Sequence, residues 1–133
     1  MHINKILSGS IFDIYGLAIG DLCPVQEYLL SLDLKDQKQI TALITFIAEN
    51  GPPTNIEKFK PLGEGIFELK TRSGIRILSF FGGSSLPRSL ILTHGFPKPK
   101  PRTLQQEIRK AVKWRKEYFR LINKVKLFKK GDT

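Results

Sequence analysis

The sequence contains a single cysteine, Cys23, among 133 residues. One cysteine cannot form a disulfide within the chain, and without a C-x-x-C pair the sequence offers neither a common zinc site nor a thioredoxin-like redox motif. No apolar run approaches the roughly 18 residues of a membrane helix, and the first 30 residues lack the basic start and apolar block of a signal peptide. We therefore expect a cytoplasmic protein with no membrane association.

The motifs of several enzyme classes are also absent. The sequence has no Gly-rich phosphate loop that ends in Lys and Ser or Thr, no H-E-x-x-H, and no pair of carboxylates in its C-terminal half. These absences disfavour metal-dependent and nucleotide-dependent enzymes, and we predict neither a metal site nor a cofactor. With 41% apolar and 26% charged residues, the composition is that of one globular domain over residues 1–133.

Acidic residues become scarce in the second half of the chain. Residues 1–66 contain 5 Lys and Arg against 8 Asp and Glu, whereas residues 67–133 contain 17 against 4. Such an asymmetry is typical of proteins that bind a polyanion, and nucleic acid is the partner class that it favours. A basic surface that only keeps the protein soluble is the alternative, and the composition leaves it open.

Strand-like segments occur in four places. One apolar segment without helical period lies early in the chain, and three more lie after a loop that is rich in Pro and Gly. Short turns separate the last three segments, which predicts an antiparallel meander. The predicted strands are residues 10–17, 66–71, 75–81 and 89–93.

Three helices are predicted from apolar periodicity and from residues that begin or end helices. Pro24 begins a short helix, since the first helical position tolerates proline. A second helix begins after Asp33 and ends before Gly51, so the two form a helical hairpin. Thr103 opens a capping box for a last helix over about residues 103–128. The order β-α-α-β-β-β-α predicts an α+β fold, with the hairpin packed on a small antiparallel sheet.

The last predicted helix is strongly basic. Between residues 109 and 130 it carries ten cations against one acidic residue, Glu117. So many like charges repel one another in an isolated helix, and a polyanionic partner would stabilise it. The ten cations are Arg109, Lys110, Lys113, Arg115, Lys116, Arg120, Lys124, Lys126, Lys129 and Lys130.

Cations also gather around the predicted meander, where Lys70, Arg72 and Arg76 flank the turn at Ser73-Gly74. A hairpin at this turn places Arg76 opposite Arg72 or Lys70. Like charges side by side are unfavourable unless an anion lies between them, so the pattern predicts a phosphate site. Cations that are directed into water are the alternative.

His94 ends the last predicted strand beside a basic loop that carries Lys98, Lys100 and Arg102. A neutral imidazole near pH 7 is a natural general acid or base. The same side chain can instead be a buried hydrogen-bond partner of a backbone carbonyl. The sequence leaves both roles open.

Five segments of the sequence, together with the preceding helical hairpin, resemble one known family. The segments are LGEGIFELK (Leu62 to Lys70), GIRIL (Gly74 to Leu78), LTHGFPK (Leu92 to Lys98), Arg102-Thr103, and EIRKA (Glu107 to Ala111). Taken in this order over roughly residues 11–118, the chain resembles the RelE/ParE superfamily of bacterial and phage toxins, and within it the phage-derived HigB-like group.

The resemblance implies the toxin of a type II toxin-antitoxin system with a RelE-like fold. It implies a ribosome-dependent mRNA endonuclease that needs no metal, in which the ribose 2′-OH attacks the adjacent phosphate and leaves a cyclic phosphate and a free 5′-OH. The implied partners are the ribosome, mRNA and a small antitoxin that often carries a DNA-binding helix-turn-helix.

The resemblance also implies site residues. Motif match gives catalytic positions at Lys70, Arg76 and Lys98, and His94 is a further catalytic candidate by its chemistry. We expect Arg76 to stabilise the charge that grows on the phosphorane and Lys70 to transfer a proton. The residues expected to bind RNA are Lys58, Lys60, Arg72, Lys100, Arg102, Arg109 and Lys113.

Two alternatives remain. One is a RelE-fold toxin without nuclease activity that acts on a protein target such as gyrase. The other is a non-enzymatic nucleic-acid-binding phage protein, for which the basic C-terminal helix suffices. The cations Lys70, Arg76 and Lys98 favour the nuclease, because a protein-directed toxin does not need to stabilise a phosphorane.

Overall fold

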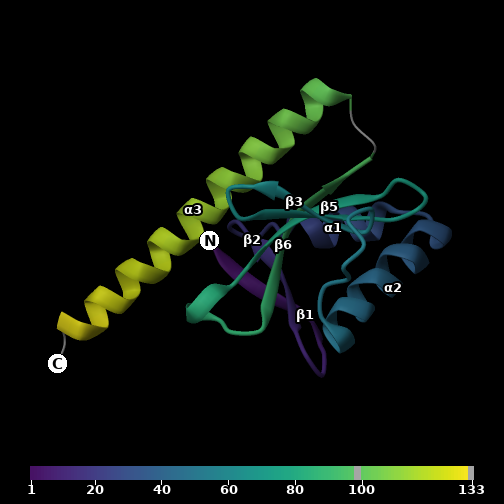
Figure 1. Ribbon diagram of the computed structural model, residues 1–133. Coiled ribbons are helices and arrows are strands. Elements are labelled where there is room, and N and C mark those ends of the chain that lie inside the picture. Colours follow the sequence, from purple (N-terminus) through teal and green to yellow (C-terminus); the bar gives the residue numbers. More distant parts are fainter. Residues whose placement is uncertain (98–99, 132–133) are drawn as a thin grey trace.

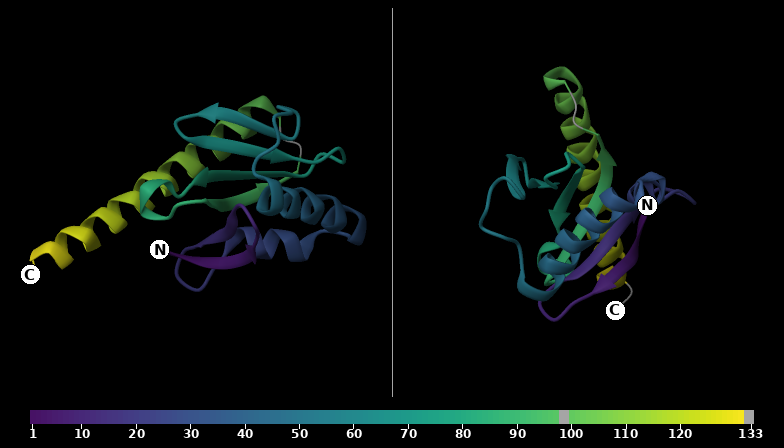
Figure 2. Two further views of the ribbon diagram at one scale, coloured as in Figure 1. Left: turned by 60° about the horizontal axis from the view of Figure 1, so that its bottom comes forward. Right: turned by 90° about the vertical axis from the view of Figure 1, so that its right-hand side faces the viewer.

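The computed structural model describes residues 1–97 and 100–131, with side chains up to residue 125. A six-stranded sheet separates two hydrophobic cores (Figure 1, Figure 2). Helices α1 (Pro24–Ser31) and α2 (Leu34–Asn50) pack on one face of the sheet, and α3 (Pro101–Gly131) crosses the other. The predicted α+β class, with a helical hairpin on a sheet and a C-terminal helix, is confirmed.

The strands contain two that the sequence did not predict. They are β1 (His2–Ser8), β2 (Asp13–Ala18), β3 (Phe59–Gly63), β4 (Ile66–Lys70), β5 (Arg76–Phe81) and β6 (Ser89–Phe96), and a short 3-10 helix, η1 (Gly83–Ser85), precedes β6. The unpredicted strands, β1 and β3, are the two edges of the sheet. Strand β3 contains Pro61, which an edge strand tolerates because its outer N–H groups need no partner. The Pro and Gly content that predicted a loop over residues 51–65 is thus also compatible with an edge strand.

Distant parts of the chain meet at the centre of the sheet. The strand order is β1-β2-β6-β5-β4-β3, and β4, β5 and β6 form the predicted antiparallel meander. Strand β2, however, pairs with β6 in parallel, from Asp13 opposite Ser89 to Gly16 opposite Leu92. The sheet is therefore mixed, and the prediction of a purely antiparallel sheet was wrong at this pair. The residue pattern of one strand does not reveal the direction of a partner that far along the chain.

Local signals placed the helical hairpin correctly. Pro24 lies in the first turn of α1. The side chain of Asp33 accepts a hydrogen bond of 2.8 Å from the backbone N–H of Asp36 and so caps α2. Gly51 follows α2 with φ at 86°, in the left-handed region that favours glycine.

Helix α3 begins at Pro101, two residues before the predicted start. The backbone N–H of Leu104 donates a hydrogen bond of 3.0 Å to the carbonyl of Lys100, so the first turn is already helical there. The prediction that Thr103 caps this helix was therefore wrong. Proline in the first turn is the stronger start signal here, because its fixed φ suits that position and no N–H is lost.

Only part of α3 packs against the sheet. Ala111, Val112 and Tyr118 are buried among residues of β4, β5 and β6, whereas Val125 is 54% exposed and the helix extends beyond the body of the protein (Figure 1). Within the described ranges, no helix is both long and apolar enough to span a membrane.

Candidate functional site

The predicted cations meet where strands β4, β5 and β6 lie side by side. The turn between β4 and β5 brings Lys70 and Arg76 together as cross-strand partners, and Arg76 lies opposite Phe96 on its other side. The backbone N–H of Lys70 donates a hydrogen bond of 3.0 Å to the carbonyl of Lys58. One row across the sheet therefore places three of the predicted cations next to one another.

A second row of cross-strand partners lies two residues further along each strand. Here Lys60 is the cross-strand partner of Glu68, Glu68 of Leu78, and Leu78 of His94. Leu78 belongs to the core beneath α3. Because alternate residues of a strand point to the same face, both rows lie on the α3 side of the sheet.

Glu68, which sequence reasoning missed, is the carboxylate of this site. Its side chain is 4% exposed, and its Oε2 accepts a hydrogen bond of 3.1 Å from Nη1 of Arg76. Glu68 thereby supplies, from within the chain, a negative charge beside the cations Lys70 and Arg76. Its position two residues before Lys70, where strand alternation puts it on the same face, is the signal that would have revealed it.

Arg76 retains an unused donor. Its side chain is 13% exposed, and its Nε is buried without a hydrogen-bond partner in the described part of the chain. A buried N–H without a partner costs about 1 to 3 kcal/mol. Arg76 is thus held by Glu68 through Nη1, while its Nε–H has no acceptor in the described part of the chain.

His94, a residue of β6, is buried against α3. Its Nε2 lies 2.7 Å from Oε2 of Glu107, and its Nδ1 lies 3.0 Å from Oγ1 of Thr93. The ring of Trp114 contacts the imidazole edge to face, with centroids 5.2 Å apart. Burial lowers the pKa of His94 against the opposing effect of Glu107. Both ring nitrogens are engaged inside the protein, which favours a packing role, with a carboxylate and a hydroxyl rather than a backbone carbonyl as partners.

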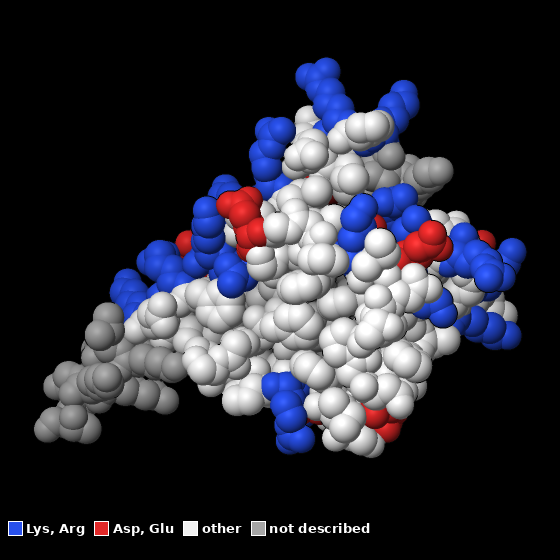
Figure 3. Space-filling view, in the orientation of Figure 1, with Lys and Arg blue, Asp and Glu red and all other residues white. Residues whose placement is uncertain are grey.

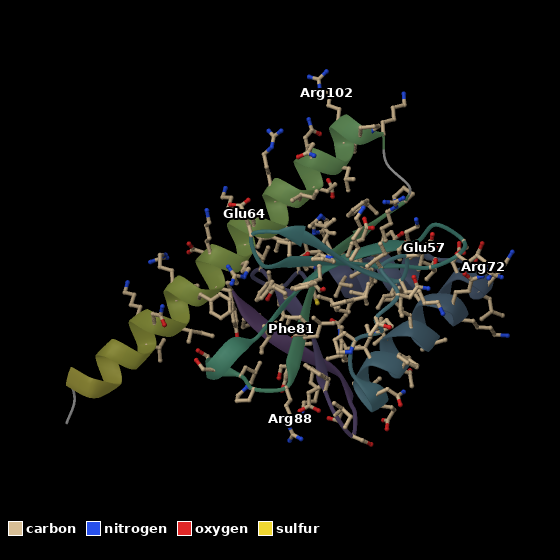
Figure 4. All side chains as sticks on the ribbon, in the orientation of Figure 1. Glu57, Glu64, Arg72, Phe81, Arg88 and Arg102 are labelled. Atoms are coloured by element: carbon tan, nitrogen blue, oxygen red, sulfur yellow. The ribbon has the colours of Figure 1, made fainter. Side chains whose placement is uncertain are left out.

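The other predicted RNA-binding residues form two exposed groups. Figure 3 shows Lys and Arg side chains along α3 and, apart from these, around the end of the sheet where Figure 4 labels Arg72. Arg109 and Lys113 line a hollow of about 520 Å³ beside α3, and Lys58, Lys70 and Arg72 line a pocket of about 400 Å³ at the other group.

The start of α3 carries two further predicted RNA-binding residues. Lys100 and Arg102 are both exposed, and Figure 4 shows Arg102 directed away from the sheet. Lys98, predicted to be catalytic, lies outside the described residues.

Comparison with known proteins gives one match. The family model described as phage derived protein Gp49-like (DUF891) matches residues 27–116. This range begins in α1, includes Lys70, Arg76 and His94, and ends in α3. No curated protein matches the chain, and no solved structure matches it.

Proposed function

Because the chain belongs to the family of phage-derived Gp49-like proteins, we propose that it is a toxin of the RelE/ParE superfamily, close to the HigB-like group, and that it cleaves mRNA on the ribosome. The observation that carries the proposal is the pair of cross-strand partners Lys70 and Arg76 on the α3 face of the sheet. Two adjacent cations on a sheet face suit a phosphate that gains negative charge during the reaction.

In the proposed reaction the chain's own groups transfer protons and stabilise charge. The 2′-oxygen of the ribose attacks phosphorus and passes its proton to a base, for which Lys70 is the candidate. Arg76 donates hydrogen bonds to the phosphorane oxygens. The bond between phosphorus and the 5′-oxygen then breaks, the leaving oxygen takes up a proton from water, to which the base returns the proton it accepted, and a 2′,3′-cyclic phosphate remains. A catalytic role for Lys98 stays a prediction.

Glu68 acts in this proposal as a positioning residue. Its hydrogen bond of 3.1 Å to Nη1 fixes one end of the guanidinium, so that the remaining donors of Arg76 have a defined direction. Fixed donors stabilise a transition state better than mobile ones, because no reorganisation is needed during the reaction. Arg76 is thus oriented before substrate binds.

The exposed cations of α3 support an RNA partner and an acidic protein partner for the same surface. Arg109, Lys113, Lys116 and Lys124 are exposed and are spaced four, three and eight residues apart, which places them along one side of the helix. We propose that this side binds ribosomal or messenger RNA in the active state. In the neutralised state it would face acidic residues of the cognate antitoxin.

Induction of the chain from a tightly controlled promoter tests the proposal. We expect growth arrest and cuts within a translated message, mapped by primer extension, and no cuts in an untranslated copy of the same message. Arg76→Ala should lower cutting about a hundredfold, because loss of one charged donor to a transition state costs on the order of 3 kcal/mol. Lys35→Ala, which removes an exposed cation from α2, serves as the control. Equal cutting of both messages would exclude ribosome dependence, and no cutting of either would exclude the nuclease.

A further inference from the structure

A pocket of about 400 Å³ lies between α2 and the end of the sheet that carries the turn from β4 to β5. Leu43 and Phe46 of α2 line one side, and Lys58, Lys70 and Arg72 line another. Its volume is within the range of pockets that hold small ligands, roughly 300 to 1,000 Å³.

Hydrogen bonds hold the walls of this pocket in place. The backbone N–H of Ser73 donates to Oε1 of Gln39 at 3.1 Å, which joins the turn to α2. Within the turn, the backbone N–H of Ile75 donates to Oγ1 of Thr71 at 3.0 Å. The turn is therefore fixed both internally and to the helix, and the pocket exists without a ligand.

The lining combines an aromatic ring with cations. Phe46 is 47% exposed and stands outside both hydrophobic cores, so its ring is available to a ligand. Lys58, Lys70 and Arg72 supply three positive charges, and the described residues that line the pocket include no Asp or Glu. An exposed ring beside cations matches a nucleotide, because bases stack on aromatic side chains and Lys and Arg bind phosphate.

The pocket and the proposed cleavage site lie on opposite faces of the sheet and share one residue. Lys70 lines the pocket and is also the cross-strand partner of Arg76. Arg76 itself does not line the pocket, so an RNA that reaches both must pass round the end of the sheet at Lys70. A base within a duplex is stacked between its neighbours and cannot enter such a pocket, whereas an unpaired base can.

We infer that this pocket binds one unpaired nucleotide of the RNA substrate, with its base against Phe46 and its phosphate at Lys58 and Arg72. The inference rests on the proposed function, since it assigns the pocket to another nucleotide of the RNA that Arg76 would help to cleave. It makes the pocket a determinant of where the message is cut, because the four bases stack with different strength.

The test measures binding of short RNA to the full chain by fluorescence anisotropy. The probe is a single-stranded hexanucleotide with 2′-O-methyl groups, which cannot be cleaved, and a second set of probes lacks one base each. Phe46→Ala should weaken binding about tenfold, since loss of one stacked base costs roughly 1 to 3 kcal/mol. Leu34→Ala is the matched control, because Leu34 is an exposed apolar residue of the same helix, 66% exposed, that does not line the pocket.

Two further variants distinguish binding in the pocket from a general effect of positive charge on RNA affinity. Ala42→Leu adds bulk to the lining one turn before Phe46 and should weaken binding in the same way. Lys58→Gln should weaken binding more than Lys35→Gln, which removes an equal charge outside the pocket. Equal affinities for Phe46→Ala and the wild type, or equal binding of probes with and without a base, would overturn the inference. The inference would also be overturned if the same concentration of inorganic phosphate displaced the probe from Phe46→Ala and from the wild type. In that case the cations would bind phosphate and the ring of Phe46 would not bind a base.

Cleavage of unmodified mRNA is measured separately in a translation reaction. Binding that depends on Phe46 without any cleavage would refute the proposed nuclease and leave the nucleotide pocket in place. Cleavage whose sites and rate do not change in Phe46→Ala would refute the pocket and leave the nuclease in place.

Discussion

The ion pair between Glu68 and Arg76 offers a quantitative test of the candidate site. Nη1 and Oε2 are 3.1 Å apart, and the side chains are 4% and 13% exposed for Glu68 and Arg76 respectively. At an effective dielectric constant of about 20, unit charges at this separation attract one another by roughly 5 kcal/mol. Desolvation of both groups offsets part of this attraction. We expect a coupling free energy of about 2 kcal/mol to remain.

The perturbations are Glu68→Gln, Arg76→Met, which keeps the apolar stem of the arginine, and the two substitutions together. Glu68→Gln should lower the free energy of unfolding by about 3 kcal/mol, because the guanidinium loses its counter-charge in a mostly buried place. The double variant should lose less than the sum of the single variants. Urea unfolding followed by circular dichroism measures all four free energies, and an unchanged m-value shows that they are comparable.

Additive effects of the two substitutions would show that the pair is not coupled and would refute this reasoning. The same variant tests positioning, since Glu68→Gln keeps the charge of Arg76 but loosens its orientation. We expect cutting by Glu68→Gln to fall by about tenfold, as the loss of one orienting interaction of about 1.4 kcal/mol would give. Unchanged cutting would mean that Glu68 only balances charge.

Three other perturbations test separate parts of the structure. Burial lowers the pKa of His94 from its ordinary value of 6.5, so below pH 6.5 the unfolded chain binds more protons than the folded one. The free energy of unfolding should therefore fall as the pH drops below 6.5. Urea titrations of His94→Asn should show a smaller fall than those of the wild type. Gly95→Ala should lower the free energy of unfolding by about 1 to 3 kcal/mol, measured by thermal melting, because the added Cβ would overlap the ring of Tyr28, and an unchanged melting temperature would contradict this packing. The double variant Lys113→Gln and Lys116→Gln should make the slope of log affinity for single-stranded RNA against log salt concentration shallower by about 1.4, or about 0.7 for each phosphate that the protein no longer neutralises. An unchanged slope would mean that this side of α3 does not touch RNA.

The helices were predictable because their ends carry local signals. Proline at position 24, the cap at Asp33 and the left-handed glycine at position 51 each act within a few residues of the chain. The two edge strands lack such signals. Strand β1 alternates only weakly between exposed and half-buried residues, and β3 contains Pro61 and Gly63, which are typical of loops.

The candidate site was predictable in its cations but not in its geometry. The spacing of Lys70 and Arg76 around a turn was enough to place them opposite one another. That Glu68 reaches Arg76 diagonally, and that His94 faces Glu107 on α3, depends on the strand register and on where the last helix packs. Both are properties of contacts between residues that are distant in sequence, and periodicity within one segment contains no information about them.

The parallel pairing of β2 with β6 limits how early the sheet can form while the chain is being synthesised. Strand β6 joins the β1–β2 hairpin to the ribbon of β5, β4 and β3, and among the described residues it follows all five other strands in chain order. Before Ser89 is synthesised these are two separate pieces, and a two-stranded hairpin alone is at best marginally stable in water. Closing the sheet then requires the ends of a loop that spans most of the chain to meet, which makes this step late and slow. A nascent chain therefore lacks the assembled row of Lys70, Arg76 and Phe96 until β6 has been made and has joined the sheet.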